Sequence, residues 1–130
     1  MQNFYLKLLM TVGCAEPMSK KLHLNFHNNV LCIYKDSENT YLSLDKSFIV
    51  FIGEIQKSEP FKVIYSKDYI NTPFPINLNQ CLKIETNHLK LNKIYEVNLE
   101  SNKNFSQRFC LIGKKKEIQV FQINDSCEEC

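Results

Sequence analysis

Hydrophobic residues in this chain recur in short segments separated by clusters of Asn, Asp, Ser, Lys and Pro. The segments are rich in Val, Ile, Phe and Tyr, which favour extended backbone. No segment keeps a helical period, and the chain has no internal repeat. The pattern therefore predicts eight strands, at residues 22–26, 30–34, 48–56, 61–65, 80–85, 94–100, 105–112 and 118–123.

The clearest alternation runs through residues 95–100, where Tyr95, Val97 and Leu99 fall on one face and polar residues on the other. Residues 48–52 are apolar on both faces, which is typical of a central strand or a covered one. The chain has three glycines, so we expect Asn and Asp at the turns. Short strands at this spacing predict an antiparallel β-sandwich.

The segment around Tyr95 indicates which kind of sandwich this is. Leu89 lies a few residues before Tyr95-Glu96-Val97-Asn98-Leu99, which is similar to the tyrosine corner of immunoglobulin-like and fibronectin type III-like domains. There the Tyr hydroxyl bonds back to upstream backbone. The predicted fold is therefore all-β, an immunoglobulin-like or fibronectin type III-like antiparallel sandwich of about seven to eight strands, stapled by disulfides.

The first fourteen residues bear on where the protein works. An apolar run ends in Gly13-Cys14, which resembles the lipobox of a bacterial lipoprotein signal peptide. This predicts a signal peptide at residues 1–13, a lipidated Cys14, a flexible tether over 14–21 and one domain over 22–130. By resemblance to bacterial sorting rules, Ala15 favours the outer membrane. The alternative is a cytosolic protein in which these residues form a strand and Cys14 is a small buried hydrophobe, because Lys7 is the only basic residue of the leader.

The net charge and the length of the apolar runs argue against nucleic acid binding and against a membrane-spanning helix. Sixteen basic and fourteen acidic residues give a net charge of +2, too small a surplus to predict nucleic acid binding. The run Lys114-Lys115-Lys116 precedes Glu117 between two apolar segments, and we interpret it as a hairpin turn. No apolar run reaches the roughly 18 residues of a membrane helix. Membrane contact is thus expected through the lipid anchor only.

Six cysteines favour an oxidising compartment over a reduced cytosol. If Cys14 is lipidated, five candidates remain for two disulfides: Cys32, Cys81, Cys110, Cys127 and Cys130. We predict one bond between Cys32 and Cys110 and one between Cys81 and the tail, through Cys127 or Cys130, although other arrangements stay open. The closing Cys-Glu-Glu-Cys is interpreted as structural, with a redox pair as the alternative.

The sequence contains no recognisable catalytic or metal-binding set, so we expect neither an enzyme nor a cofactor. His23 and His27 share one side of a predicted strand but lie about 13 Å apart at 3.3–3.4 Å per residue, too far to bind one ion. His88 has no local nucleophile beside it, although a Cys–His dyad remains open. One C-x-x-C without a second is insufficient for a zinc knuckle.

Several segments occur in the order found in a known family. After the lipobox-like leader come residues 28–34 around Cys32, then Phe74-Pro75-Ile76 before Cys81, Tyr95-Glu96-Val97, residues 105–111 around Cys110, and a terminal cysteine. This order resembles a family of small periplasmic lipoproteins assigned to type VI secretion immunity. The resemblance implies a protein that binds a toxic effector in the periplasm and neutralises it. The alternative is a structural or secretion-assembly lipoprotein of the envelope.

Recognition by a sandwich normally falls on its loops. Two predicted connections are long, and they carry the candidate residues for partner binding: Glu38 and Tyr41 between residues 36 and 47, and Lys67, Tyr69 and Phe74 between residues 66 and 79. An exposed aromatic on a Pro-stiffened loop is a typical interface anchor. The alternative is that these aromatic rings pack down on the sheet.

Overall fold

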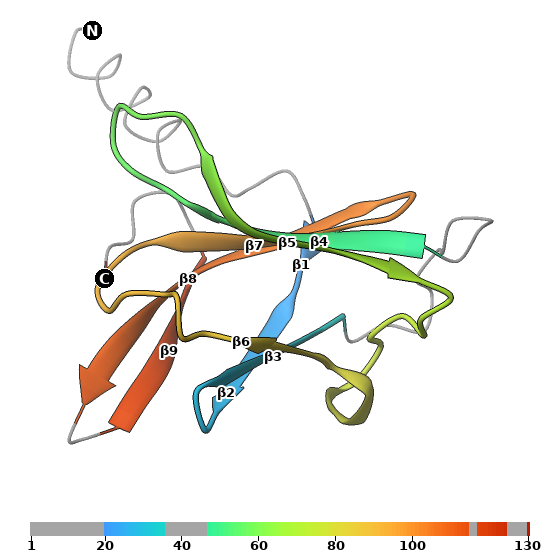
Figure 1. Ribbon diagram of the computed structural model, residues 1–130. Helices are drawn as coiled ribbons and strands as arrows, with labels where there is room; N and C mark the ends of the chain where they lie inside the picture. Colours follow the sequence, from blue (N-terminus) through green and yellow to red (C-terminus); the bar gives the residue numbers. More distant parts are fainter. Residues whose placement is uncertain (1–19, 36–46, 115–116, 125–129) are drawn as a thin grey trace, which may run out of the picture.

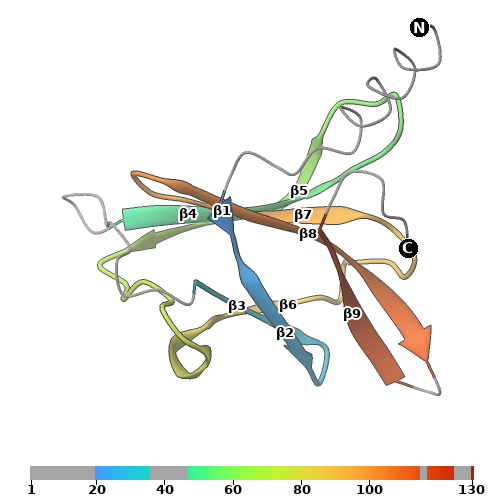
Figure 2. The same cartoon turned by 180° about the vertical axis from the view of Figure 1, so that it is seen from behind.

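The computed structural model describes residues 20–35, 47–114, 117–124 and 130. Within them two sheets pack face to face, as Figures 1 and 2 show from opposite sides. The elements are β1 (Lys20–Lys21), β2 (His23–His27), β3 (Val30–Tyr34), β4 (Ser47–Glu54), β5 (Lys62–Ile70), the 3-10 helix η1 (Leu78–Gln80), β6 (Leu82–Glu85), β7 (Tyr95–Glu100), β8 (Asn104–Lys114) and β9 (Glu117–Ile123).

The larger sheet has the order β1-β8-β7-β4-β5, with β9 also paired to β8, and the smaller sheet has the order β2-β3-β6. In immunoglobulin lettering β2, β3 and β6 correspond to A, B and E, whereas β4, β7 and β8 correspond to C, F and G. β5 adds to the free side of β4, at the place of strand C′. The predicted immunoglobulin-like β-sandwich is confirmed.

The core lies between the two inner faces and follows the predicted alternation. Tyr95, Val97 and Leu99 of β7 are buried, and the residues between them are only half-buried. They meet Leu31 and Ile33 from the smaller sheet, and the whole set forms one hydrophobic cluster. The tyrosine corner is also present, because the Tyr95 hydroxyl accepts a hydrogen bond from the Lys90 backbone N–H at 2.9 Å.

All eight predicted strands occur, and most of their ends lie within two residues of the prediction. Two differences are more substantial. The connection predicted to begin at Ser66 is strand until Ile70, because β5 continues along β4 and its backbone stays paired. At the other end, Lys20 and Lys21 pair in parallel with Phe105 and Ser106 of β8, so the sheet begins two residues before the predicted domain start.

Asparagine takes the turn positions as expected. Asn28 and Asn29 join β2 to β3 with φ of 52° and 63°, the left-handed pair that a two-residue hairpin loop requires. Asn71 and Asn92 also have positive φ, at 52° and 61°. Asparagine tolerates this region better than most residues with a side chain, which explains how the fold forms with so few glycines. The hairpin predicted at the lysine run is present as well, since Lys114 pairs with Glu117.

One strand pair leaves the plane of the larger sheet. β8 first runs beside β7, then continues with β9, and the β8–β9 ribbon reaches toward the smaller sheet next to β2 (Figure 1). The chain entering β2 does the reverse, since Leu22 still donates its N–H to the carbonyl of Ser106 on β8 at 3.2 Å. After Leu22 the chain passes into the smaller sheet. β2 and the β8–β9 ribbon therefore diverge from a common point.

Candidate functional site

The residues predicted to bind a partner do not come together in one exposed loop. Phe74 is 5 % exposed and packs in the core against Phe48 and Phe105, so the prediction that it is an exposed anchor is wrong. Its apolar ring gains more from burial in the core than from a surface position. Glu38 and Tyr41 lie outside the described residues.

Lys67 and Tyr69 belong to β5 and not to a loop. The Tyr69 ring stacks on Phe48 with 5.0 Å between centroids, and the Lys67 ammonium lies 5.1 Å from the Tyr69 centroid. Burial, followed by the charge of Tyr65 and a hydrogen bond with it, raises the pKa of Tyr69 to about 12. Tyr69 is therefore half-buried against the sheet, which is the packing alternative, and only its edge remains available to a partner.

The cysteines pair differently from the prediction. Cys32 bonds to Cys81, with their Cα atoms 5.4 Å apart, and Cys110 bonds to Cys130, with their Cα atoms 6.1 Å apart. The predicted bond between Cys32 and Cys110 is wrong because each lies on the outer face of its own sheet. Cys32 falls between two core residues of β3, and Cys110 falls between Phe109 and Leu111 of β8.

The second predicted bond, from Cys81 to the tail, is wrong for a related reason. Cys81 directly precedes β6, the neighbour of β3, and it lies diagonal to Cys32 on the same outer face. The tail does take part in a bond, through Cys130, but its partner is Cys110. Cys14 and Cys127 lie outside the described residues.

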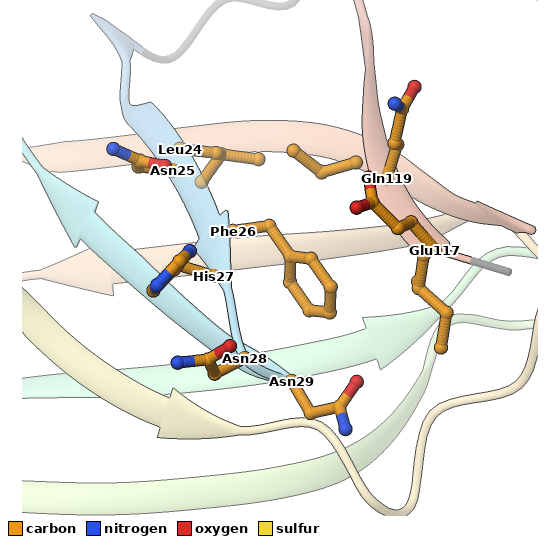
Figure 3. Close-up of a pocket in the computed structure, with 10 residues that line it drawn as sticks. Leu24, Asn25, Phe26, His27, Asn28, Asn29, Glu117 and Gln119 are labelled. Carbon is orange, nitrogen blue, oxygen red and sulfur yellow. The ribbon is translucent and has the colours of Figure 1, made fainter. Parts of the chain in front are cut away.

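A cleft with a volume of about 710 Å³ lies between β2 and β9. Its walls are the strand segment from Leu24 to the Asn28-Asn29 turn and the start of β9 from Glu117 to Val120. Figure 3 shows Leu24 and Phe26 projecting from β2 toward β9, while Asn25 and His27 project the other way. The inner side of the cleft is thus apolar and its outer side is polar. We name it the β2–β9 cleft.

The backbone of β2 turns every second residue toward this cleft. His27 and Val30 flank a two-residue loop, and such a pair exchanges both of its hydrogen bonds. The N–H and C=O groups of Phe26 and Leu24 therefore point away from β3. The carbonyl of Leu24 accepts a hydrogen bond from Gln122 Nε2 on β9 at 3.3 Å, which agrees with this orientation.

The same reasoning applies to β9. Lys114 and Glu117 are paired across a two-residue connection, so the backbone groups of Ile118, Val120 and Gln122 point away from β8. β9 runs antiparallel to β2 (Figure 1), and the bond between Gln122 and Leu24 places these groups on the side of β9 that faces β2. In the described part of the chain, however, no backbone hydrogen bond joins β2 to β9. Hydrogen bonds thus join β2 to the β8–β9 ribbon at Leu22 and Leu24, and none is found at Phe26 among the described residues. We call the end of the cleft at the Asn28-Asn29 turn its open end.

The described residues provide no metal centre, because no group of three or more His, Cys, Asp or Glu side chains is close enough to hold an ion. His23 stacks on Tyr34 with 5.1 Å between ring centroids, and His88 stacks on Tyr65 at 5.7 Å. In the same part of the chain no helix is long and apolar enough to cross a membrane. Comparisons with models of known families, with curated proteins and with solved structures give no match.

Sequence reasoning did not find the β2–β9 cleft. Its side chains alternate in the ordinary way for strands, and what distinguishes it is that neither strand edge is paired with another strand among the residues that the structure describes. A signal was nevertheless present in the Asn28-Asn29 dipeptide and in the lysine turn, because two-residue hairpins fix which backbone groups face outward.

Proposed function

We propose that this chain is an immunity protein, which binds and neutralises a toxic type VI secretion effector acting in the periplasm. Action through protein–protein contact is supported by one observation above all: in the β2–β9 cleft two strand edges face each other beside an apolar wall, and no described strand pairs with either edge there. Strand edges of this kind pair with other polypeptides. The choice of an effector as the partner comes from the family resemblance of the leader and the ordered motifs.

The chemistry of the cysteines is compatible with that location. Two disulfides within one small domain persist in oxidising compartments such as the bacterial periplasm. A lipid on Cys14 would hold the domain near the membrane, because only five residues separate Cys14 from β1. β1 and β2 run in one direction from there, so the open end of the cleft, at the Asn28-Asn29 turn, would point away from the anchor.

The test of this function is a rescue assay. The product of a neighbouring effector gene is directed to the periplasm of a sensitive host, alone or with this protein. Rescue of growth by the wild-type chain supports the proposal. A Cys14→Ala variant, still exported by a substituted leader, separates neutralisation from anchoring: it should rescue at high expression and less well at low expression. Failure of the wild-type chain to rescue with its neighbouring effector contradicts the proposal.

A second candidate function is that of a structural or secretion-assembly lipoprotein. It is favoured by the other end of the larger sheet, where β5 pairs with β4 on one side and carries Ile70, 71 % exposed, and Val63, 51 % exposed. Two interaction edges on one domain suit an assembly component with two neighbours. In that case deletion of the gene should weaken the envelope in cells that meet no effector, as measured by detergent sensitivity.

A further inference from the structure

We propose that the β2–β9 cleft receives an extended segment of the partner protein, which inserts as an additional strand between β2 and β9. This inference rests on the proposed function for the identity of the partner, but its mode of binding can be tested separately. It also goes further than that function, because it assigns a site, a backbone geometry and a residue pattern to the bound segment.

The first argument is how the hydrogen bonding of the backbone changes along the edge of β2 that faces β9. Leu22 is bonded to Ser106 of β8, and Leu24 is bonded to the Gln122 side chain. Phe26 pairs with Leu31 of β3 on one side, but in the described part of the chain no strand pairs with it on the side toward β9. A side-chain amide at Leu24 occupies a place that a strand backbone would otherwise take. Pairing on this side of β2 thus decreases along the strand, from a backbone bond at Leu22 to a side-chain bond at Leu24 and to none at Phe26 within the described residues.

The second argument is that the two walls match each other. Because β2 and β9 run antiparallel, the contact between Leu24 and Gln122 would place the outward backbone groups of Phe26 opposite those of Val120. A strand between them would be antiparallel to one wall and parallel to the other, and it would pair with both. The stretch from Leu24 to Asn28 measures roughly 14 Å at 3.4 Å per residue, so a segment of about five residues fits it.

The third argument concerns side chains and sets the chemistry of the partner. Leu24 and Val120 contribute to or pack on the hydrophobic core, and Phe26 packs on it while remaining half-buried. Asn25, His27 and Gln119 are exposed on the outer side. Because side chains of a strand alternate between faces, the inserted segment should alternate apolar and polar residues, with the apolar ones covering Phe26 and Ile118.

Charge fixes one further position. Among the residues that line the cleft, Glu117 is the only one with a full negative charge, and it lies at the open end. A Lys or Arg in the bound segment at that end would complement it. Because this pair would be exposed to solvent, it contributes to the orientation of the segment more than to its affinity.

The experiment uses a library of random peptides of about nine residues, long enough to cover the cleft with a margin at each end. It is selected on the wild-type protein with disulfides intact. Enriched peptides should alternate apolar and polar residues. Their binding is then measured on Ile118→Pro, which removes an outward N–H without touching the bonds to β8, and on Ile118→Ala, which removes the side chain but keeps that N–H.

The proposal predicts that Ile118→Pro weakens these peptides by about tenfold or more, while Ile118→Ala changes binding by less than about threefold. Glu117→Gln should weaken only peptides with a basic residue at one end, by about twofold to fivefold. On the β2 wall, hydrogen exchange at the Phe26 amide should slow when a selected peptide is bound. This readout does not depend on how well the proline variant folds.

Several results would overturn the proposal. They are no enrichment of alternating peptides, equal binding to Ile118→Pro and wild type, unchanged exchange at Phe26, or a concentration-dependent dimer that fills the cleft with a second copy. The two proposals fail separately. If the wild-type chain neutralises its effector while selected peptides neither bind nor compete, the insertion mode is wrong and the function stands. If peptides bind as described but no effector is neutralised, the function is wrong.

Discussion

The Tyr95 hydroxyl accepts a hydrogen bond from the backbone N–H of Lys90, five residues upstream, at 2.9 Å. The ring is 2 % exposed and lies against Phe109 with 5.9 Å between centroids. One side chain therefore both fills the core at the start of β7 and holds the loop that enters the strand. This tyrosine corner closes the end of the sandwich where the connection crosses from the smaller sheet to the larger one.

Replacing Tyr95 by Phe should lower the free energy of unfolding by about 1–2 kcal/mol, because the ring stays packed while the Lys90 N–H loses its partner. Urea denaturation measures this. The matched control is Tyr34→Phe, in which the altered ring stacks on His23 at the outer face of the smaller sheet. A loss at Tyr95 no larger than that at Tyr34 would show that the corner does not stabilise the fold.

The strands of this fold were predictable because their alternation is local. Tyr95, Val97 and Leu99 identify the inner face of β7 from sequence alone, and the tyrosine corner follows from the same segment. The predicted strand at residues 61–65 ends too early, because Lys67 falls on the core-facing side of β5, where an apolar residue is expected. At the edge of the sheet its ammonium can lie over Tyr69 instead. Its stem can cover apolar surface there while the charge stays in water.

The alternation of side chains along a strand also bears on which cysteines can pair. Cys32 stands between Leu31 and Ile33, so a strand that buries those two residues must turn Cys32 outward. Applied to Cys110, the same alternation separates the two cysteines by both sheets. The β2–β9 cleft was not predictable, because it depends on which strand edges remain without a neighbour. That follows from the order of strands in space and not from the residues of any one strand.

The pairing makes a chemical prediction. Peptide mapping without reduction should recover the pairs Cys32–Cys81 and Cys110–Cys130. Changing both Cys32 and Cys81 to Ser should cost roughly 4 kcal/mol on the chain-entropy estimate, and changing Cys110 and Cys130 roughly 3 kcal/mol, because the first bond closes the longer loop. Recovery of a Cys32–Cys110 peptide would contradict this arrangement.

Gly53 and Phe61 form a second testable pair. β4 and β5 shift register between Ile52 and Gly53, and a Cβ on Gly53 would overlap the Phe61 ring, which also lies edge-on to Phe51. Gly53→Ala should cost about 1 kcal/mol or more, because the ring must leave its place on the sheet. In a Phe61→Ala background the same substitution should cost measurably less. Additive losses in this double-mutant cycle would show that the two residues do not interact.

The last prediction concerns pH and Tyr69. Its pKa is raised to about 12, first by burial and then by Tyr65, so the fold favours the neutral phenol. A group whose pKa is raised on folding stabilises the protein below its unfolded pKa, here about 10, and loses that contribution as pH rises through the folded value. We therefore expect Tyr69 to favour the folded state fully below about pH 10 and progressively less toward pH 12.

Two measurements check this expectation. The difference in phenolate absorbance between wild type and Tyr69→Phe should titrate near pH 12, well above an ordinary tyrosine. The melting temperature of wild type should also fall more steeply above pH 10 than that of Tyr69→Phe.

Tyr65→Phe is the matched control, since it removes the hydrogen bond and charge that help to raise the pKa of Tyr69. It should bring the titration of Tyr69 closer to its ordinary value. A difference spectrum that titrates near pH 10 would show that Tyr69 is open to solvent, and its edge would then be a stronger candidate for partner contact than its packing on Phe48 suggests.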